Sequence, residues 1–293
     1  GVQGLRLILW GMFKKVVIAD SLAPFVDTIF KNYATLNGGV LLLGLIYFSF
    51  QIYCDFSGYS DIAIGTAKLF GIELISNFKF PYLSRDLSEF WRRWHISLSS
   101  WFRDYIYIPL FNKIHDDDII DQTLVYKIQG IKITLITFLI SGLWHGANWT
   151  FIFWGIGNGI LYILYNSLKN LNIFKILNIK NSIVKIVLSI IKASSTFFLI
   201  TLLWVLFRSN TLNDAFSYYS KIWSISIDDQ FNFYKSGLFV FIFILFTIES
   251  IFKSRDFIFD TKKMNPLQSN LFNYFILPSI VWLIIILEHT KPL

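Results

Sequence analysis

Six stretches of about 20 mainly apolar residues recur along the chain, and they constrain its fold more than any other feature. A helix of that length is enough to cross the hydrocarbon core of a bilayer, and a helix satisfies its own backbone hydrogen bonds there. We therefore predict an all-α, polytopic helical membrane protein. Because the second and third stretches adjoin, we expect one of them to be tilted, short or re-entrant. The expected spans are 37–56, 128–147, 149–168, 186–207, 234–252 and 271–288.

The charge balance supports the same interpretation. Charged residues make up 15% of the chain and apolar residues 55%, whereas soluble domains carry about 25% charged residues. The net charge of +7 is also compatible with a nucleic-acid-binding protein, but the Lys and Arg residues gather in the segments between the expected spans. Segments 57–132, 169–192 and 253–263 hold 18 of them, against 8 elsewhere. By the positive-inside rule these segments face the cytoplasm, so we expect no nucleic-acid partner and place the His145 end of its helix toward the outer leaflet.

Nothing in the sequence divides the chain into separate domains, since it shows no repeat, low-complexity tract or long linker. We expect a single membrane domain over 1–293. The lone cysteine, Cys54, excludes an internal disulfide and is interpreted as a small core residue. No cleavable signal is visible and the chain opens with Gly1. We therefore expect a fragment or a truncated chain.

The stretch 85–107 is too charged to span a bilayer, yet its spacing is helical. We predict one interfacial helix, capped by Ser88 and supported by pairing among Arg85, Glu89 and Arg93. A helix that only anchors itself at the lipid headgroups is the alternative interpretation. The helix would carry two faces: an aromatic one with Trp91, Trp94, Leu98, Trp101 and Tyr105, and a polar one with Arg92, His95, Ser99 and Arg103.

Other polar residues are expected to be structural. Lys14 and Lys15 lie in the apolar run 5–18, which fits an interfacial helix whose lysines reach up to the headgroups. Asp55 and Asp61 are six residues apart, so on a helix they would not share a face, and internal pairing is expected for Asp61. The acidic segment 108–127 reads as a solvated loop, with a metal site as the alternative.

A histidine at the end of an apolar helix is the strongest candidate for chemistry. His145 shares one helix face with Thr134, Thr137, Ser141 and Asn148. Such a face can simply join helices by hydrogen bonds, but Gly142 and Gly146 would leave room for something else to approach His145. A buried imidazole favours its neutral form, which can accept a proton as a general base. Asn148, Trp144 and Trp149 could supply N–H donors, although indoles at this depth are often only anchors.

These residues resemble the membrane-bound O-acyltransferases, in the branch typified by alginate O-acetyltransferase. The resemblance covers nearly the whole chain and is strongest over 5–165. The resemblance also implies further membrane helices upstream of residue 1, which we expect this chain to lack. The sequence departs from the family pattern where the acidic loop follows Leu110 and where Asn158 replaces a frequent histidine. The matching runs are 11–20, 50–65, 81–86, 90–110 and 142–149, with a weaker match at 204–209; they include Phe90-Trp91-Arg92-Arg93-Trp94-His95-Ile96-Ser97 and Gly142-Leu143-Trp144-His145-Gly146-Ala147-Asn148-Trp149.

The resemblance implies a bundle around a transmembrane tunnel, with an acyl thioester (acetyl-CoA or an acyl carrier) as cytoplasmic donor and no bound cofactor or metal. It implies that His145 is the catalytic histidine, as general base or acyl relay, and that His95 is a second functional histidine. Arg92 and Arg103 would steer an anionic donor. The remaining residues expected to line the path of the substrate are Ser99, Ser141, Trp144 and Asn148.

We therefore expect an acetyl group to be moved across the bacterial cytoplasmic (inner) membrane and attached to a hydroxyl of an envelope or exported polysaccharide. A separate extracytoplasmic acetyltransferase would be the partner. Two alternatives stay open: D-alanyl transfer toward teichoic acid, and a transporter or channel without chemistry.

Overall fold

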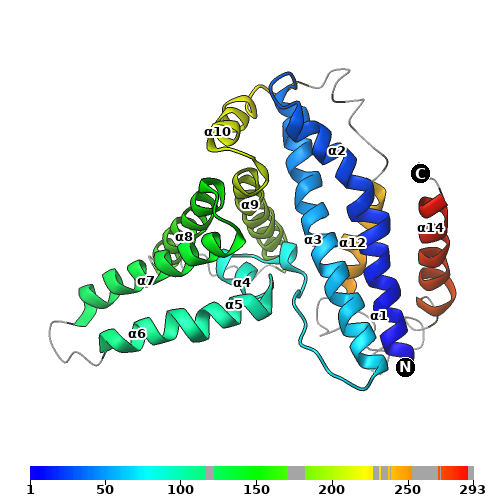
Figure 1. The fold of residues 1–293 in the computed structure, drawn as a ribbon, viewed down its shortest axis with the longest axis horizontal. Helices are drawn as coiled ribbons and strands as arrows, with labels where there is room; N and C mark the ends of the chain where they lie inside the picture. Colours follow the sequence, from blue (N-terminus) through cyan, green and yellow to red (C-terminus); the bar gives the residue numbers. More distant parts are fainter. Residues whose placement is uncertain are drawn as a thin grey trace. The chain divides into compact units, whose positions relative to one another are not determined.

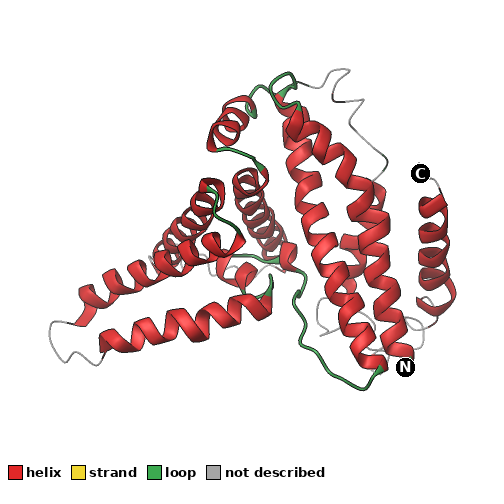
Figure 2. Cartoon of the chain, in the orientation of Figure 1, coloured by secondary structure: helices red, strands yellow, loops and turns green. Residues whose placement is uncertain are grey.

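The computed structural model describes residues 1–115, 122–170, 182–226, 239–252 and 272–289, together with residues 231, 237 and 270. Every regular element in these ranges is helical, as Figures 1 and 2 show. The prediction of an all-α fold is confirmed, and so is its membrane character. Within the described residues, four helices are long and apolar enough to cross a membrane: Gly38–Leu69 (α3), Lys127–His145 of α7 (Gln122–His145), Trp149–Leu168 of α8 (Trp149–Asn170) and Ile183–Arg208 of α9 (Ser182–Arg208).

The expected spans differ from the structure in two ways. The first continues to Leu69, well past the expected end at residue 56, because the acidic residues along it find lysine partners. Within the described residues, the last two expected spans coincide with apolar helices that are shorter than a membrane-spanning helix. These are α12 (Phe239–Phe252) and α14 (Leu277–His289), the latter preceded by the π-helix η5 (Phe272–Ile276).

The chain divides into two compact units, which are described separately below. The first contains Gly1–Lys79 and Ser220–Leu293, and the second contains Phe80–Tyr219. Helix α10 (Leu212–Lys221) ends the second unit and runs into the return segment of the first.

In the first unit a nearly continuous helical stretch packs along α3 (Figure 1). It consists of α1 (Val2–Met12), the π-helix η1 (Phe13–Ala19) and α2 (Asp20–Lys31). A Cβ atom at Gly4 would lie 2.6 Å from the carbonyl oxygen of Gly65, and one at Gly11 would lie 2.5 Å from that of Gly58. The two helices therefore run antiparallel in backbone contact, and only glycine fits where they cross.

Lys14 lies inside this unit instead of reaching the headgroups, so the interfacial prediction is wrong for it. Its side chain is 4% exposed, and its Nζ lies 2.6 Å from Asp61 Oδ2 and donates to Ser57 Oγ at 3.0 Å. The neighbouring Lys15 is 43% exposed and pairs with Asp55 at 2.6 Å. The two carboxylates of α3 thus face different lysines, which confirms that they do not form a catalytic pair and that Asp61 pairs internally.

Helix α12 is tied to α3 by a buried polar contact. Tyr53 donates its hydroxyl hydrogen to Glu249 Oε1 at 2.5 Å, and both residues are 2% exposed. Cys54, next to Tyr53, is fully buried, in agreement with its predicted role as a core residue.

The second unit is built around a tight helical hairpin of α7 and α8 (Figure 1). A Cβ atom at Gly142 would lie 2.4 Å from the carbonyl oxygen of Phe151, and one at Gly155 would lie 2.3 Å from that of Phe138. Gly146, with φ of +151°, forms the turn, and the Phe151 ring lies over it. The space that the sequence suggested beside His145 is therefore occupied by α8.

The stretch 85–107 is not one helix, so its two predicted faces are wrong as continuous surfaces. It contains α4 (Leu87–Trp91), α5 (Ile96–Phe102) and the π-helix η3 (Arg103–Tyr107), and it follows the 3₁₀ turn η2 (Pro81–Leu83). The break falls at His95, whose backbone is left-handed with φ of +45°. It turns Trp94 into the core at 5% exposure, whereas Trp101 and Tyr105 remain 49% and 69% exposed.

The predicted loop over 108–127 begins instead as helix α6 (Ile108–His115). Its run of aspartates, Asp116, Asp117, Asp118 and Asp121, lies outside the described residues. Among the residues that are described, no group of His, Cys, Asp and Glu could hold a metal ion.

Candidate functional site

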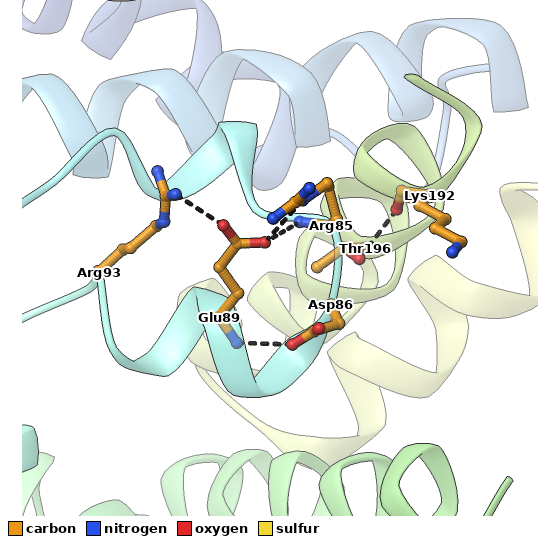
Figure 3. A network of polar contacts seen from close by, with 6 residues as sticks. All are labelled: Arg85, Asp86, Glu89, Arg93, Lys192 and Thr196. Atoms are coloured by element: carbon orange, nitrogen blue, oxygen red, sulfur yellow. Dashed lines mark hydrogen bonds and ion pairs between the residues drawn. The ribbon is translucent and has the colours of Figure 1, made fainter. Parts of the chain in front are cut away.

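Helix α4 is positioned by a polar network at its beginning (Figure 3). Asp86 caps the helix by accepting the backbone N–H of Glu89 at 2.7 Å, a role that the sequence had assigned to Ser88. Glu89 accepts from the backbone N–H of Arg85 at 2.8 Å and from the Arg93 guanidinium at 2.6 Å, so the predicted pairing by fours is confirmed. Burial raises the pKa of Glu89, but these donors and charges outweigh it, and the net pKa is lowered.

This network connects α4 to the hairpin as well. Ser88 Oγ donates to Asn166 Oδ1 near the end of α8 at 3.2 Å. Trp91, at the last position of α4, packs edge-on against Phe138 of α7 and Trp154 of α8. The short helix is therefore fixed at both ends, and this fixes where the following break at His95 lies.

The ring of His145 lies in a cluster of aromatic side chains from α8 and α9. The centroid distances are 5.1 Å to Trp154, 5.0 Å to Phe207 and 6.2 Å to Phe151. Trp204 stacks on Trp154 and contacts Phe207, which extends the cluster into the core. His145 is half-buried and faces protein side chains, as expected for an ionisable group at membrane depth.

His95 lies beside His145, with Trp144 touching both. The Trp144 ring is 4.9 Å from that of His145 and 6.1 Å from that of His95, and the two imidazoles are near enough to interact electrostatically. Burial lowers the pKa of His95, against a hydrogen bond to its own backbone that raises it. Ser97 Oγ lies 3.5 Å from His95 Nδ1. The structure thus brings together the two histidines and the tryptophan that the sequence singled out.

Other predicted site residues have structural contacts. Asn148 accepts the Thr150 backbone N–H at 3.1 Å, which caps α8, and it donates to the carbonyl oxygen of Asn210 at 3.0 Å. Ser99 donates to the Trp94 carbonyl oxygen at 3.1 Å across the helix break. Ser141 is 8% exposed on the buried side of α7. These contacts stabilise the turn before α8 and the helix break at His95, and they thereby position the two histidines.

The two arginines that were expected to steer the donor are exposed. Arg92 is exposed at the break, and the side chain of Arg103 is 61% exposed and pairs with Asp104 at 2.7 Å. Asn158, which stands where a histidine is frequent in the family, is 3% exposed and donates to the Trp154 carbonyl oxygen at 2.9 Å.

The sequence did not identify Trp154 and Phe207 as neighbours of His145. Phe207 belongs to a run singled out as a weak match, but its contact with the histidine joins two residues that are 62 positions apart in the sequence. Trp154 lies on the next helix after the turn, and an assumption of an antiparallel hairpin would have found it.

Chemically, the arrangement offers one half-buried imidazole packed against aromatic rings, a second imidazole nearby, and the indole of Trp144 beside both. A neutral imidazole can accept a proton from a hydroxyl, and N–H donors can stabilise a carbonyl oxygen that gains charge. Such groups suit acyl transfer.

Comparison with known proteins agrees with this chemistry. The model of the membrane-bound O-acyltransferase family matches residues 2–201. The chain is 37% identical to a probable alginate O-acetylase AlgI of Azotobacter vinelandii over 222 residues, which are 76% of this chain and 40% of the relative. It is 38% identical to a peptidoglycan O-acetyltransferase of Helicobacter pylori over 212 residues, 72% of this chain and 37% of the relative.

A more distant match is the teichoic acid D-alanyltransferase of Streptococcus thermophilus, at 34% identity over 167 residues, 54% of this chain and 38% of the relative. The chain spans about two fifths of the length of these curated relatives. By the extent of these matches, the chain belongs to the membrane-bound O-acyltransferase family.

Proposed function

We propose that the protein is a membrane O-acyltransferase that moves an acetyl group from a cytoplasmic thioester toward a hydroxyl on the far side of the membrane. The observation that carries the proposal is the meeting of His95 and His145 at Trp144, inside one aromatic cluster. An ionisable side chain at membrane depth is costly unless it has a function, and His145 ends a helix that is long and apolar enough to cross a membrane.

In the proposed reaction an acceptor hydroxyl attacks the carbonyl carbon of the thioester, a C–O bond forms and the C–S bond breaks. Neutral His145 takes the hydroxyl proton and returns it to the departing thiolate, so an ester and a thiol leave the site. Apolar surroundings favour the neutral form of an imidazole, which this role requires. His95 positions or polarises the thioester from the other side of Trp144.

The remaining residues would shape the path of the substrate. Ser141, Trp144, Asn148 and Ser99 support or line the region around the histidines, and Arg92 and Arg103 are exposed cations that can attract an anionic donor. The tunnel that joins the two membrane faces, and a single domain over 1–293, are part of this proposal.

The names of the relatives support the proposed acetyl group and polysaccharide acceptor, and the resemblance in sequence supports the proposed donor and partner. We propose acetyl-CoA or an acetylated carrier as donor, an envelope or exported polysaccharide as acceptor, and an extracytoplasmic acetyltransferase as partner. The cytoplasmic membrane of a bacterium is the proposed location. The similarity to a teichoic acid D-alanyltransferase supports D-alanyl transfer as the second candidate.

Replacing His145 by Ala tests the proposal. Loss of a general base lowers acyl transfer by about 10²–10⁴-fold, and product O-acetylation in membranes, measured by ester release, should fall accordingly. Leu143→Ala changes an exposed apolar residue at the same helix end and is the matched control. A His145→Ala variant that inserts and folds but still acetylates at the wild-type rate would refute the catalytic role. A protein that conducts polysaccharide without any ester product would support the channel alternative.

A further inference from the structure

A buried hydrogen-bond donor near the histidines has no acceptor. The indole N–H of Trp91 is shielded from solvent and finds no hydrogen-bond partner within the described part of the chain. Buried polar groups in proteins are nearly always satisfied, and an unmet donor costs the fold free energy. Trp91 therefore carries a cost that calls for an explanation.

The ring itself is well packed, so the unmet N–H does not reflect a loose side chain. Trp91 contacts Phe90 at 5.3 Å, Phe138 at 5.4 Å and Trp154 at 6.1 Å between ring centroids. Helix α4, which carries it, is held by Glu89 and by the Ser88 contact with Asn166. A phenylalanine would keep an aromatic ring at this position without the unmet donor.

Trp91 is also connected to the candidate site. Trp154 touches Trp91 on one side and His145 on the other, at 5.1 Å and with perpendicular rings. Trp91 precedes His95 by one turn of the chain, immediately before the break. Trp91 is thus linked to His145 through the ring of Trp154.

We propose that the Trp91 indole N–H binds the carbonyl oxygen of the acyl group as it approaches His145. This inference rests on the proposed function, which brings an uncharged group with an acceptor oxygen into an apolar surrounding. A carbonyl supplies the acceptor that the indole lacks, and the rings of Phe138 and Trp154 suit the acetyl methyl group. Since Trp91 is linked to His145 through Trp154, it is a binding and positioning residue that acts before the chemical step.

The test compares thioester and thiol binding in Trp91→Phe. The ligands are S-acetyl-4′-phosphopantetheine and 4′-phosphopantetheine, which carry the arm common to CoA and acyl carriers and differ by the acetyl carbonyl. We expect wild-type protein in detergent to bind the thioester about tenfold more tightly than the thiol, as one buried hydrogen bond allows. Trp91→Phe should bind both equally. Trp94→Phe removes another indole N–H from the same cluster and should keep the preference.

Thermal unfolding without ligand separates this role from simple packing. Because the removal of an unmet donor offsets the cost of the smaller ring, Trp91→Phe should unfold near the wild-type temperature, while the KM for the donor rises about tenfold and kcat changes little. Acetyl-CoA, measured in parallel, tells whether the nucleotide adds affinity and so distinguishes CoA from a carrier as the source of the arm.

Each outcome has a defined meaning. An unchanged thioester preference in Trp91→Phe would overturn the inference while leaving the proposed function intact. A lower unfolding temperature with equal weakening of both ligands would assign Trp91 to packing alone. A wild-type protein that binds neither ligand nor acetyl-CoA would instead overturn the proposed donor, and the inference with it.

Discussion

Replacing Asp61 by Asn should destabilise the first unit far more than the same change at Asp55. Lys14 is 4% exposed and Asp61 19% exposed, and their charged atoms lie 2.6 Å apart. Breaking a buried ion pair by removing one partner costs about 3–5 kcal/mol, because it leaves an uncompensated charge. Ser57 still accepts from Lys14, so we expect the lower end, about 3 kcal/mol.

Asp55→Asn is the matched control on the same helix. Asp55 and Lys15 are 54% and 43% exposed, and Lys15 keeps a second partner in Asp20 at 2.9 Å. Exposed ion pairs contribute about 0–1 kcal/mol. The difference between the two Asn variants should therefore be about 2 kcal/mol or more.

A second substitution tests whether the unpaired charge of Lys14 causes this loss of stability. Adding Lys14→Met to Asp61→Asn removes the orphaned charge, and replacement of both partners of a buried pair by uncharged groups is often close to neutral. The double variant should regain most of the stability that Asp61→Asn loses. Unfolding by SDS in mixed micelles, followed by tryptophan fluorescence, gives the free energies in one medium for all variants.

Two results would refute this reasoning. If Asp61→Asn and Asp55→Asn lower the free energy of unfolding by the same small amount, the Lys14–Asp61 pair contributes no more than an exposed ion pair. No recovery in the double variant would mean that Lys14 contributes through its packing against Trp10 and Tyr53 and not through its charge.

Two other predictions use the same assay. Glu89→Gln should cost about 2 kcal/mol at pH 7, since hydrogen bonds to a charged group are lost. Because the pKa of Glu89 in the folded protein is lowered from 4.5, its charge stabilises the fold above that pH, and the stability difference from wild type should shrink as the pH falls below it. A difference that stays constant with pH would contradict the role of its charge. Gly142→Ala should cost about 1–3 kcal/mol by overpacking, since its Cβ would meet the Phe151 carbonyl oxygen at 2.4 Å. Gly130→Ala on the same helix meets no atom within 4 Å and should stabilise by up to about 1 kcal/mol; equal effects of the two changes would contradict the close packing of α7 on α8.

The long helices were predictable because their cause is local. Runs of apolar residues define α7, α8 and α9 whatever surrounds them, and the end of α7 at His145 was expected to within a residue or two. The end of α3 was not, because it depends on Lys14 reaching Asp61 from another helix. Polar residues end a span only when they lack such partners.

The histidine pair was partly predictable and its setting was not. His95 and His145 stand out as ionisable residues in apolar surroundings, and the family resemblance raised the same two positions. The break at His95 could not be read from spacing, because a left-handed histidine has no Gly or Pro to mark it. It follows from Glu89 and Trp94 being fixed in the core, which are tertiary contacts.

The antiparallel contact of α1 and α3 bears on how the chain enters the bilayer during synthesis. Lys14 leaves the ribosome before Asp61, so the ammonium is made well before the carboxylate that neutralises it. Insertion of α3 beside α1 delivers the pair with no net charge, and the glycine crossings at Gly11 and Gly58 let the two backbones meet in that register. Since each charge would be costly in lipid without the other, we expect the two helices to insert together as a hairpin.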